Sequence, residues 1–300
     1  MNTMHKRICV SLMAGLGLAP PLVAQDFSKV ELQTTALADN LYVIAGGGGN
    51  VAVSVGEDGV LLVDDSYTEL KDKLDSAVKA ITKAPIRMVI NTHWHFDHVG
   101  GNQALATAGA IIVAHDSVRK RMSEDQHLAG IDRHIPASPV KALPLITFAD
   151  GLTLHWNGDE VRVMHLPPAH TDGDSMVYFA SANVLHVGDV WFNGMYPFID
   201  INAGGSLAGI VAAGDRALAQ ANEQTKIIPG HGAVSNSAEL KRYRDVLATI
   251  DERVRTLAAS GKSREEIIAA KPSQQFDEQW SGSWRPDTWI GIVYDGMSKK

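Results

Sequence analysis

Cysteine is almost absent from this sequence of 300 residues, and the single one, Cys9, lies close to the N-terminus. One thiol cannot form a disulfide framework within the chain. Thiolate ligands are equally excluded from any metal site beyond the first residues. A metal site in the body of this protein therefore has to be built from nitrogen and oxygen atoms.

Long apolar runs are also scarce. The longest one, ICVSLMAGLGLAPPLVA, contains two prolines and is short for a membrane span. Lys6 and Arg7 precede it, and Ala24 offers a small residue for cleavage, an arrangement typical of a secretory signal peptide. We therefore predict a signal peptide over residues 1–24, a mature chain that begins near Gln25 and a periplasmic or secreted protein, with an uncleaved anchor as the alternative.

Basic clusters are missing as well. The formal charge is −7, the isoelectric point is near 5.9, and no group of lysines or arginines stands out. This balance argues against a nucleic-acid partner, which would require a basic surface. With 45% hydrophobic residues and no linker, repeat or low-complexity tract, the chain favours one globular domain over residues 25–300. The expected partner is a small molecule, with no membrane contact after signal cleavage.

What the sequence does contain is two successive series of strand-like runs and helical segments. The first series includes a helix over Glu69–Ile81 and the buried run IRMVIN. The second includes a helix over Leu207–Ala221 and a long helix over Ser237–Ala259 with a serine as its N-cap. The stretch VKALPLITF is predicted as a strand, and residues 117–135 as a helix followed by a polar excursion. This order predicts two sheets packed face to face with helices outside.

The segment NTHWHFDHVGGN, which follows IRMVI, concentrates four metal-binding side chains in six positions: His93, His95, Asp97 and His98. Burying so many polar groups without a metal would leave several of them unsatisfied. Imidazole and carboxylate together suit a divalent ion such as zinc. In an extended turn the alternate residues His93 and His95 point to the same side, so two ions could share the segment.

Three later turns each follow a strand-like run and carry one further candidate. They are PPAHTDGDS with His170, HVGDVW with Asp189 and PGHG with His231. The remaining histidines of the body of the chain are isolated and are assigned no role: His115, His127, His134, His155, His165 and His186.

The order HxHxDH, PxHTxG, GlyAsp and PGH resembles the metallo-β-lactamase superfamily over nearly the whole mature chain. The resemblance implies an α/β fold, a four-layer αβ/βα sandwich with two zinc ions at the sheet edges. Carried over by position, the first zinc would be bound by His93, His95 and His170, the second by Asp97, His98 and His231, with Asp189 bridging both. Asp64 would orient a ligand histidine, although Asp65 next to it leaves that assignment ambiguous.

The resemblance also implies a reaction. A zinc-bound hydroxide would attack an amide or ester carbonyl, with Asp97 as the residue that orients it. We therefore predict an exported dinuclear zinc hydrolase, with β-lactams as the best substrate class and lactones second. The alternatives are a lactonase or esterase of the same fold, an iron-containing oxidoreductase of the same fold, and a metal-binding protein without activity.

The segment after Asp189 narrows the substrate prediction. The well-known zinc β-lactamases generally carry cysteine or serine at this position, whereas aspartate is typical of thioesterases such as glyoxalase II, lactonases, phosphodiesterases and some β-lactamase-like outliers. VWFNGMYPFIDINAGGS replaces the basic glutathione-binding segment expected of glyoxalase II, which argues against that activity. We expect this stretch to form a pocket wall with Trp191, Phe192, Asn193, Tyr196 and Phe198, and GlyGlySer at 204–206 to start a helix facing an anion; plain loop packing is the alternative.

Overall fold

The computed structural model describes residues 26–297, so the predicted signal peptide and Cys9 lie outside the described part. The first half forms a seven-stranded sheet in the order β1-β2-β3-β4-β5-β6-β9. Strands β1 to β4 pair antiparallel, and β4, β5, β6 and β9 pair parallel. The strand bounds are β1 Gln33–Ala38, β2 Leu41–Ala45, β3 Val51–Ser54, β4 Val60–Val63, β5 Ile86–Ile90, β6 Ile111–His115 and β9 Ile146–Phe148.

The second half forms a six-stranded sheet in the order β10-β11-β12-β13-β14-β15. It is antiparallel except for the pair β13 and β14, which is parallel. The bounds are β10 Gly151–Trp156, β11 Asp159–His165, β12 Ser175–Phe179, β13 Val184–His186, β14 Lys226–Ile228 and β15 Ser235–Asn236. Parallel strands place their carboxyl ends at one sheet edge, so the turns after β5, β13 and β14 are brought to one side of the molecule.

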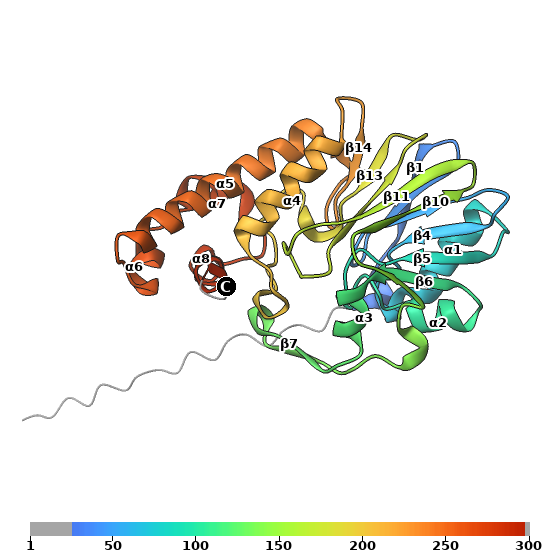
Figure 1. Ribbon diagram of the computed structural model, residues 1–300, viewed down its shortest axis with the longest axis horizontal. Helices are drawn as coiled ribbons and strands as arrows, with labels where there is room; N and C mark the ends of the chain where they lie inside the picture. The colour runs from blue at the N-terminus through green and yellow to red at the C-terminus, as the bar shows by residue number, and fades with distance from the viewer. Residues whose placement is uncertain (1–25, 298–300) are drawn as a thin grey trace, which may run out of the picture.

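The core between the two sheets confirms the sandwich. One buried cluster joins residues of the first sheet, such as Leu61 and Ile90, to residues of the second, such as Val163 and Val184. The outer face of the first sheet packs against helix α1 (Lys71–Ile81) and helix α2 (Asn102–Thr107). The outer face of the second is covered by α4 (Leu207–Gln220) and α5 (Ser237–Ala259), as Figure 1 shows. Four layers in the order αβ/βα result, as predicted.

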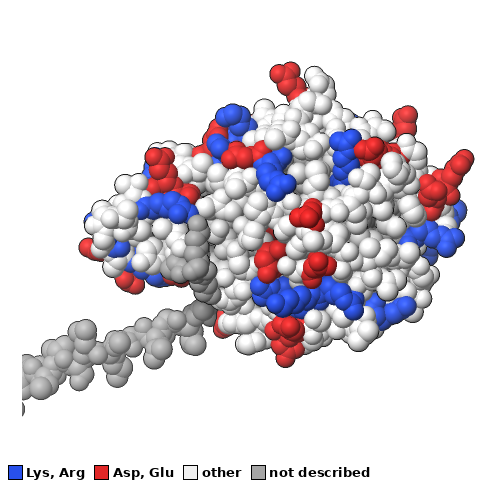
Figure 2. Space-filling model, viewed as in Figure 1, with Lys and Arg blue, Asp and Glu red and all other residues white. Residues whose placement is uncertain are grey.

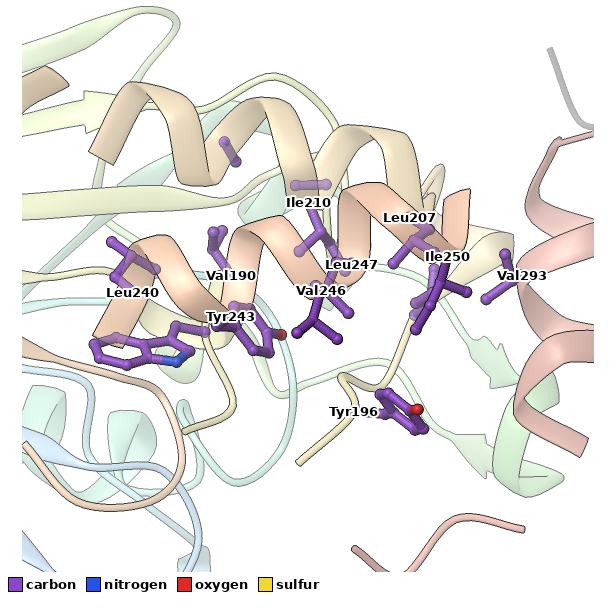
Figure 3. Packing of buried hydrophobic residues seen from close by; sticks show 14 of the residues in the cluster. Val190, Tyr196, Leu207, Ile210, Leu240, Tyr243, Val246, Leu247, Ile250 and Val293 are labelled. Carbon is purple, nitrogen blue, oxygen red and sulfur yellow. The ribbon is translucent and has the colours of Figure 1, made fainter. Parts of the chain in front are cut away.

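Helix α5 shows why the outer layer is stable. Its apolar residues recur at helical spacing and face α4, where Leu247 and Ile250 lie beside Leu207 and Ile210 (Figure 3). The N-cap is Asn236, whose side chain accepts a hydrogen bond from the amide of Glu239. The expected serine cap was therefore wrong. Asparagine serves the position equally well because its short side chain reaches the third amide of the helix.

Several connecting segments differ from the expectation. Residues 33–38 form an additional edge strand, β1, and only residues 146–148 of VKALPLITF are a strand, because its first residues form a short 3-10 helix over Val140–Ala142. After α3 (Asp116–Met122) the polar excursion is a hairpin of β7 (Gln126–Leu128) and β8 (Arg133–Ile135). The aromatic C-terminal segment folds into α7 (Gln274–Trp280) and α8 (Pro286–Met297), after the short helix α6 (Arg264–Ala269).

On the surface, acidic and basic side chains are mixed over the face that Figure 2 shows, with one band of Lys and Arg in the region of α3. Helix α3 itself carries Arg119, Lys120 and Arg121 in its last turn. Among residues 26–297, no helix combines the length and apolar character needed to cross a bilayer.

Candidate metal centre

All seven predicted ligands meet at the edge where strands from both sheets end. His93, His95, Asp97 and His98 lie in the turn after β5, His170 follows β11, and His231 follows β14. Asp189 lies in a 3-10 turn, Gly188–Val190, after β13. Their potential ligand atoms form two groups, each with all atoms within 4.8 Å of one another. The first group is His93, His95, His170 and Asp189; the second is Asp97, His98 and His231.

Asp189 lies between the two groups. Its Oδ2 atom is 3.4 Å from His170 Nε2 and 3.3 Å from His231 Nε2. Its Oδ1 atom is 3.1 Å from His98 Nε2. Oδ2 therefore lies near one histidine of each group and Oδ1 near a second histidine of the second group, so the carboxylate is in reach of both groups.

Hydrogen bonds on the far side of the rings fix how they point into the site. His98 Nδ1 lies 2.7 Å from Asp64 Oδ2, which also accepts a hydrogen bond from the Thr92 hydroxyl. The same hydroxyl is 3.0 Å from His93 Nδ1. Asp64, and not Asp65, therefore orients the ligand histidine, which resolves the ambiguity left by the sequence. Asp65 instead accepts the amide hydrogen of Gly101.

The other two rings are held in the same way. His170 Nδ1 lies 2.8 Å from the Phe198 carbonyl oxygen. His95 Nε2 lies 3.1 Å from Asp200 Oδ2, so His95 presents its Nδ1 atom to the site. Asp200 was not found by sequence reasoning, because it lies 105 residues from His95 and no motif surrounds it. Partners of this kind fix the tautomer of a ligand histidine and raise its basicity.

The site leaves buried polar atoms without hydrogen bonds. Among the described residues, His93 Nε2 is buried without a hydrogen-bond partner, and His98 Nε2 and Asp189 Oδ1, although 3.1 Å apart, form no hydrogen bond with each other or with another group. Each such atom is costly unless something else coordinates it. Imidazole nitrogens and carboxylate oxygens without thiolates are a donor set that binds zinc and related divalent ions. The residues present therefore fit two metal ions, and nothing in the donor set argues against them.

Electrostatics favour neutral rings at two of the histidines and an ionised carboxylate at Asp189, which are the states that ligation requires. Burial lowers the pKa of His93 well below its usual range and lowers the pKa of His170 to about 4, so these rings are neutral and offer lone pairs. Burial opposes ionisation of Asp189, yet the surrounding histidines, His231 first, hold its pKa well below the ordinary value. At His98, burial opposes the charge but Asp189, Asp97 and Asp64 together raise the pKa, so this ring favours the protonated form and a metal ion would have to displace its proton.

Glycines allow the close packing around this turn. A Cβ atom at Gly100 would lie 2.3 Å from the amide nitrogen of Thr68, and one at Gly49 would lie 2.2 Å from the ring of His98. The backbone of the loop before β3 therefore approaches His98 directly, which no larger residue would permit.

The predicted pocket wall is only partly correct. Trp191 and Tyr196 are fully buried in the core under α4 and α5 and do not face the site. Phe192 does, since its ring stacks on His231 at a centroid distance of 4.8 Å. Phe198 lies 5.6 Å from the ring of His95. The backbone N–H of Asn193 donates to the His231 carbonyl oxygen and its side-chain amide donates to the Ala233 carbonyl oxygen, and these two bonds hold the turn.

The expected anion site at GlyGlySer is used internally. The Ser206 side chain accepts the amide hydrogen of Gly209, and the start of α4 packs against the backbone of Pro168, where a Cβ at Gly209 would be 1.9 Å from the carbonyl oxygen. The histidines without a predicted role have other surroundings: His115 stacks on His165, His127 stacks on His134, His186 contacts the Asn50 carbonyl, and His155 is exposed.

Comparisons with known proteins identify the family of this chain. The family model described as the metallo-beta-lactamase superfamily matches residues 44–237. The hydroxyacylglutathione hydrolase of Polaromonas sp. (strain JS666) is 26% identical over 205 residues, which cover 65% of this chain and 66% of that protein. The chain spans between 35% and 66% of the length of five curated relatives with this name.

Solved structures share the fold. A metallo-beta-lactamase from Pontibacter korlensis superposes with a TM-score of 0.61 at 19% identity, covering 73% of this chain and 99% of that one. An inverting sec-alkylsulfatase from Pseudomonas sp. superposes with a TM-score of 0.67 at 17% identity, covering 88% of this chain and 50% of that one. With the family model covering well over half of its length, this chain belongs to the metallo-beta-lactamase superfamily.

Proposed function

We propose that this metallo-hydrolase is exported, contains two zinc ions and opens the carbonyl of a cyclic amide or ester, with β-lactams as the leading substrate class. The observation that carries the proposal is the pair of buried ligand groups joined by Asp189, with ligand atoms that have no hydrogen-bond partner. We infer that His93, His95 and His170 hold one ion, that Asp97, His98 and His231 hold the other, and that Asp189 contacts both.

Zinc ions at such a site lower the pKa of bound water and polarise a carbonyl oxygen. The protein's own residues supply the positioning. The Asp97 side chain is 12% exposed, and its Oδ2 atom lies 3.4 Å from His231 Nε2. This carboxylate can accept a hydrogen bond from the attacking water and orient it toward the substrate. The rings of Phe192 and Phe198 exclude solvent beside the ligands, which strengthens electrostatic interactions at the reacting atoms.

Metal analysis and activity test the proposal together. Purified protein should contain about two zinc ions per chain, as expected of a two-metal site. Asp97→Ala and His98→Ala should abolish the hydrolysis of a β-lactam, and a chelator should do the same until zinc is restored. A screen over β-lactams, homoserine lactones, thioesters and phosphodiesters identifies the substrate. Full activity in a metal-free sample, or iron in place of zinc, would overturn the proposal.

A thioester hydrolase is the second candidate. The curated relatives named hydroxyacylglutathione hydrolase favour it, and so does aspartate at position 189. The segment after Asp189 argues against glutathione, because only uncharged and acidic residues occur in VWFNGMYPFIDINAGGS. Comparing kcat/KM for S-lactoylglutathione with kcat/KM for the same acyl group on an uncharged thiol shows whether a thioesterase activity depends on glutathione. Faster turnover of the glutathione thioester than of any β-lactam would make this candidate the leading one.

Export rests on residues 1–24, which we propose to be a cleaved signal peptide before a single domain over residues 25–300. Sequencing the N-terminus of the protein from a periplasmic or culture fraction should begin near Gln25. An intact N-terminus in the cytoplasmic fraction would contradict export.

A further inference from the structure

The hairpin β7–β8 lies beside the metal centre, where it contacts Phe96 within the ligand turn and Phe198 next to the ring of His95. At its tip, a Cβ on Gly130 would lie 2.8 Å from the ring of Phe198. On β8, the guanidinium carbon of Arg133 lies 3.8 Å above the ring centroid of Phe96. Phe96 itself is the residue between His95 and Asp97. In Figure 1 the strand β7 lies near the turn that precedes α4, in agreement with a hydrogen bond of 2.9 Å from Asn202 Nδ2 to the His127 carbonyl.

Arg133 has no protein anion to bind. Its side chain is exposed, and within residues 26–297 it makes no ion pair or hydrogen bond through its guanidinium group. The neighbouring carboxylate, Asp132, lies 2.9 Å from His127 Nε2. Arg121, by contrast, is paired with Asp172 at 2.7 Å. The carboxylates of the metal centre lie near histidines, so the guanidinium group of Arg133 is available to an anion from outside the protein.

Tyr67 places this charge at the entrance to the metal centre. Its ring lies 5.7 Å from Phe96, and a Cβ on Gly48 would lie 2.7 Å from the Tyr67 ring and 3.2 Å from Asp97 Cβ. Burial and then the charge of Asp97 raise the pKa of Tyr67, and Arg133 acts in the opposite direction. The Tyr67 hydroxyl group therefore lies within the electrostatic influence of both Asp97 and Arg133, and it stays protonated as a hydrogen-bond donor.

We propose that Arg133 binds a carboxylate group of the substrate, with Phe96 as the surface that holds the guanidinium plane and Tyr67 as a neighbouring hydrogen-bond donor. The inference rests on the proposed function, because it assigns a substrate group to the same site. A guanidinium stacked on an aromatic ring keeps its N–H groups free at the edge, where they match the two oxygens of a carboxylate. Such a bidentate pair selects substrates by charge and orientation.

A pair of compounds that differ only in this charge tests the proposal. The probe is a chromogenic cephalosporin with a free carboxylate, and the comparison is its methyl ester, both with the zinc-loaded protein. Arg133→Gln should raise KM for the acid about tenfold, as expected for a lost charge-assisted hydrogen bond, with kcat changed far less. The KM of the ester should change much less than that of the acid.

Two further variants control for general effects. Lys120→Gln removes a charge from exposed α3 and should leave both compounds at the values of the unaltered protein. Arg133→Lys keeps the charge but loses the planar stack, so its KM for the acid should lie between those of the unaltered protein and Arg133→Gln. Equal changes for acid and ester, or an unchanged KM for the acid, would overturn the assignment.

Binding measurements separate this inference from the proposed function. If the unaltered protein cleaves neither compound, the β-lactam proposal fails, and the intact compounds then serve as ligands in isothermal titration calorimetry. Arg133→Gln should bind the acid about tenfold more weakly and the ester with little change. The same Kd for the acid in both proteins would overturn the role of Arg133 whatever the reaction is.

Discussion

The two ligand groups of the metal centre differ in how far solvent reaches them. In the first, the side chains of His93, His95 and His170 are 1%, 4% and 0% exposed. In the second, His98 is 0% exposed, but Asp97 is 12% and His231 is 23% exposed. We therefore expect substrate and water to reach the site from the side of the second group. Under the proposed function, the first group would fix the position of the site and the second would face the reacting atoms.

The two groups also differ in how many of their histidine rings are held by a hydrogen bond outside the site. His93, His95 and His170 each have a hydrogen-bond partner on the far side of the ring. His98 has Asp64, whereas the ring of His231 stacks on Phe192. We therefore expect the ion of the second group to exchange more readily than that of the first.

Replacing Asp189 should weaken metal binding at both groups, because this carboxylate faces both of them. The expected difference between the two ions in metal exchange would then disappear. Asp189→Ala is expected to lose both ions and at least about 100-fold in kcat/KM, since losses of 10- to 100-fold already follow when only an outer partner of a ligand is changed. Metal analysis and hydrolysis kinetics measure the two effects. Glu223→Ala, an exposed acidic control, should change neither. Retention of two ions by Asp189→Ala would show that the groups bind independently.

Removing one histidine from each group should separate the ions. His231→Ala is expected to retain about one zinc ion per chain with high affinity, because the buried group keeps its three histidines. His170→Ala should lose the ion of the first group and keep only the ion of the second group, which we expect to be bound more weakly. Titration with a chromophoric chelator distinguishes the two variants. The reverse order of affinities would contradict the assignment of the buried group as the tighter one.

Two carboxylates that hold ligand histidines from outside the site, Asp200 and Asp64, allow a test with smaller expected effects on metal affinity. Asp200→Asn should weaken the first group, through His95, and Asp64→Asn the second, through His98, each by about 10- to 100-fold in metal affinity. Competition with a chelator shows which of the two binding steps changes in each variant. An identical effect of both substitutions on both steps would mean that the groups are coupled.

The smallest expected effect concerns the stack between Phe192 and His231. Phe192→Ala should weaken the second ion by a few-fold, since an aromatic pair contributes about 0.5–1.5 kcal/mol beyond its buried area. Phe276→Ala, on α7 and distant from the ligands, is the matched control and should leave metal affinity unchanged. A loss as large as that of Asp64→Asn would show that Phe192 does more than support one ring.

The parts of the fold and of the metal centre that could be predicted are those whose residues lie close together in the sequence. The quartet in NTHWHFDHVGGN could be recognised because its residues are adjacent, and the strand before it has a clear apolar pattern. Asp200 could not, because only the folded chain brings it to His95. Trp191 and Phe192 are neighbours, yet one is buried under the helices and the other faces the ligands, which depends on a bend that composition does not reveal.

The ligands come from both sheets, with four side chains following β5 of the first and three following β11, β13 and β14 of the second. Metal ions bound there would join the two halves of the sandwich and add their binding free energy to the stability of the native state. Depleting a cell of the metal would then lower the abundance of folded protein as well as its turnover. Without the metal ions, a larger fraction of the chains would be unfolded and open to proteolysis.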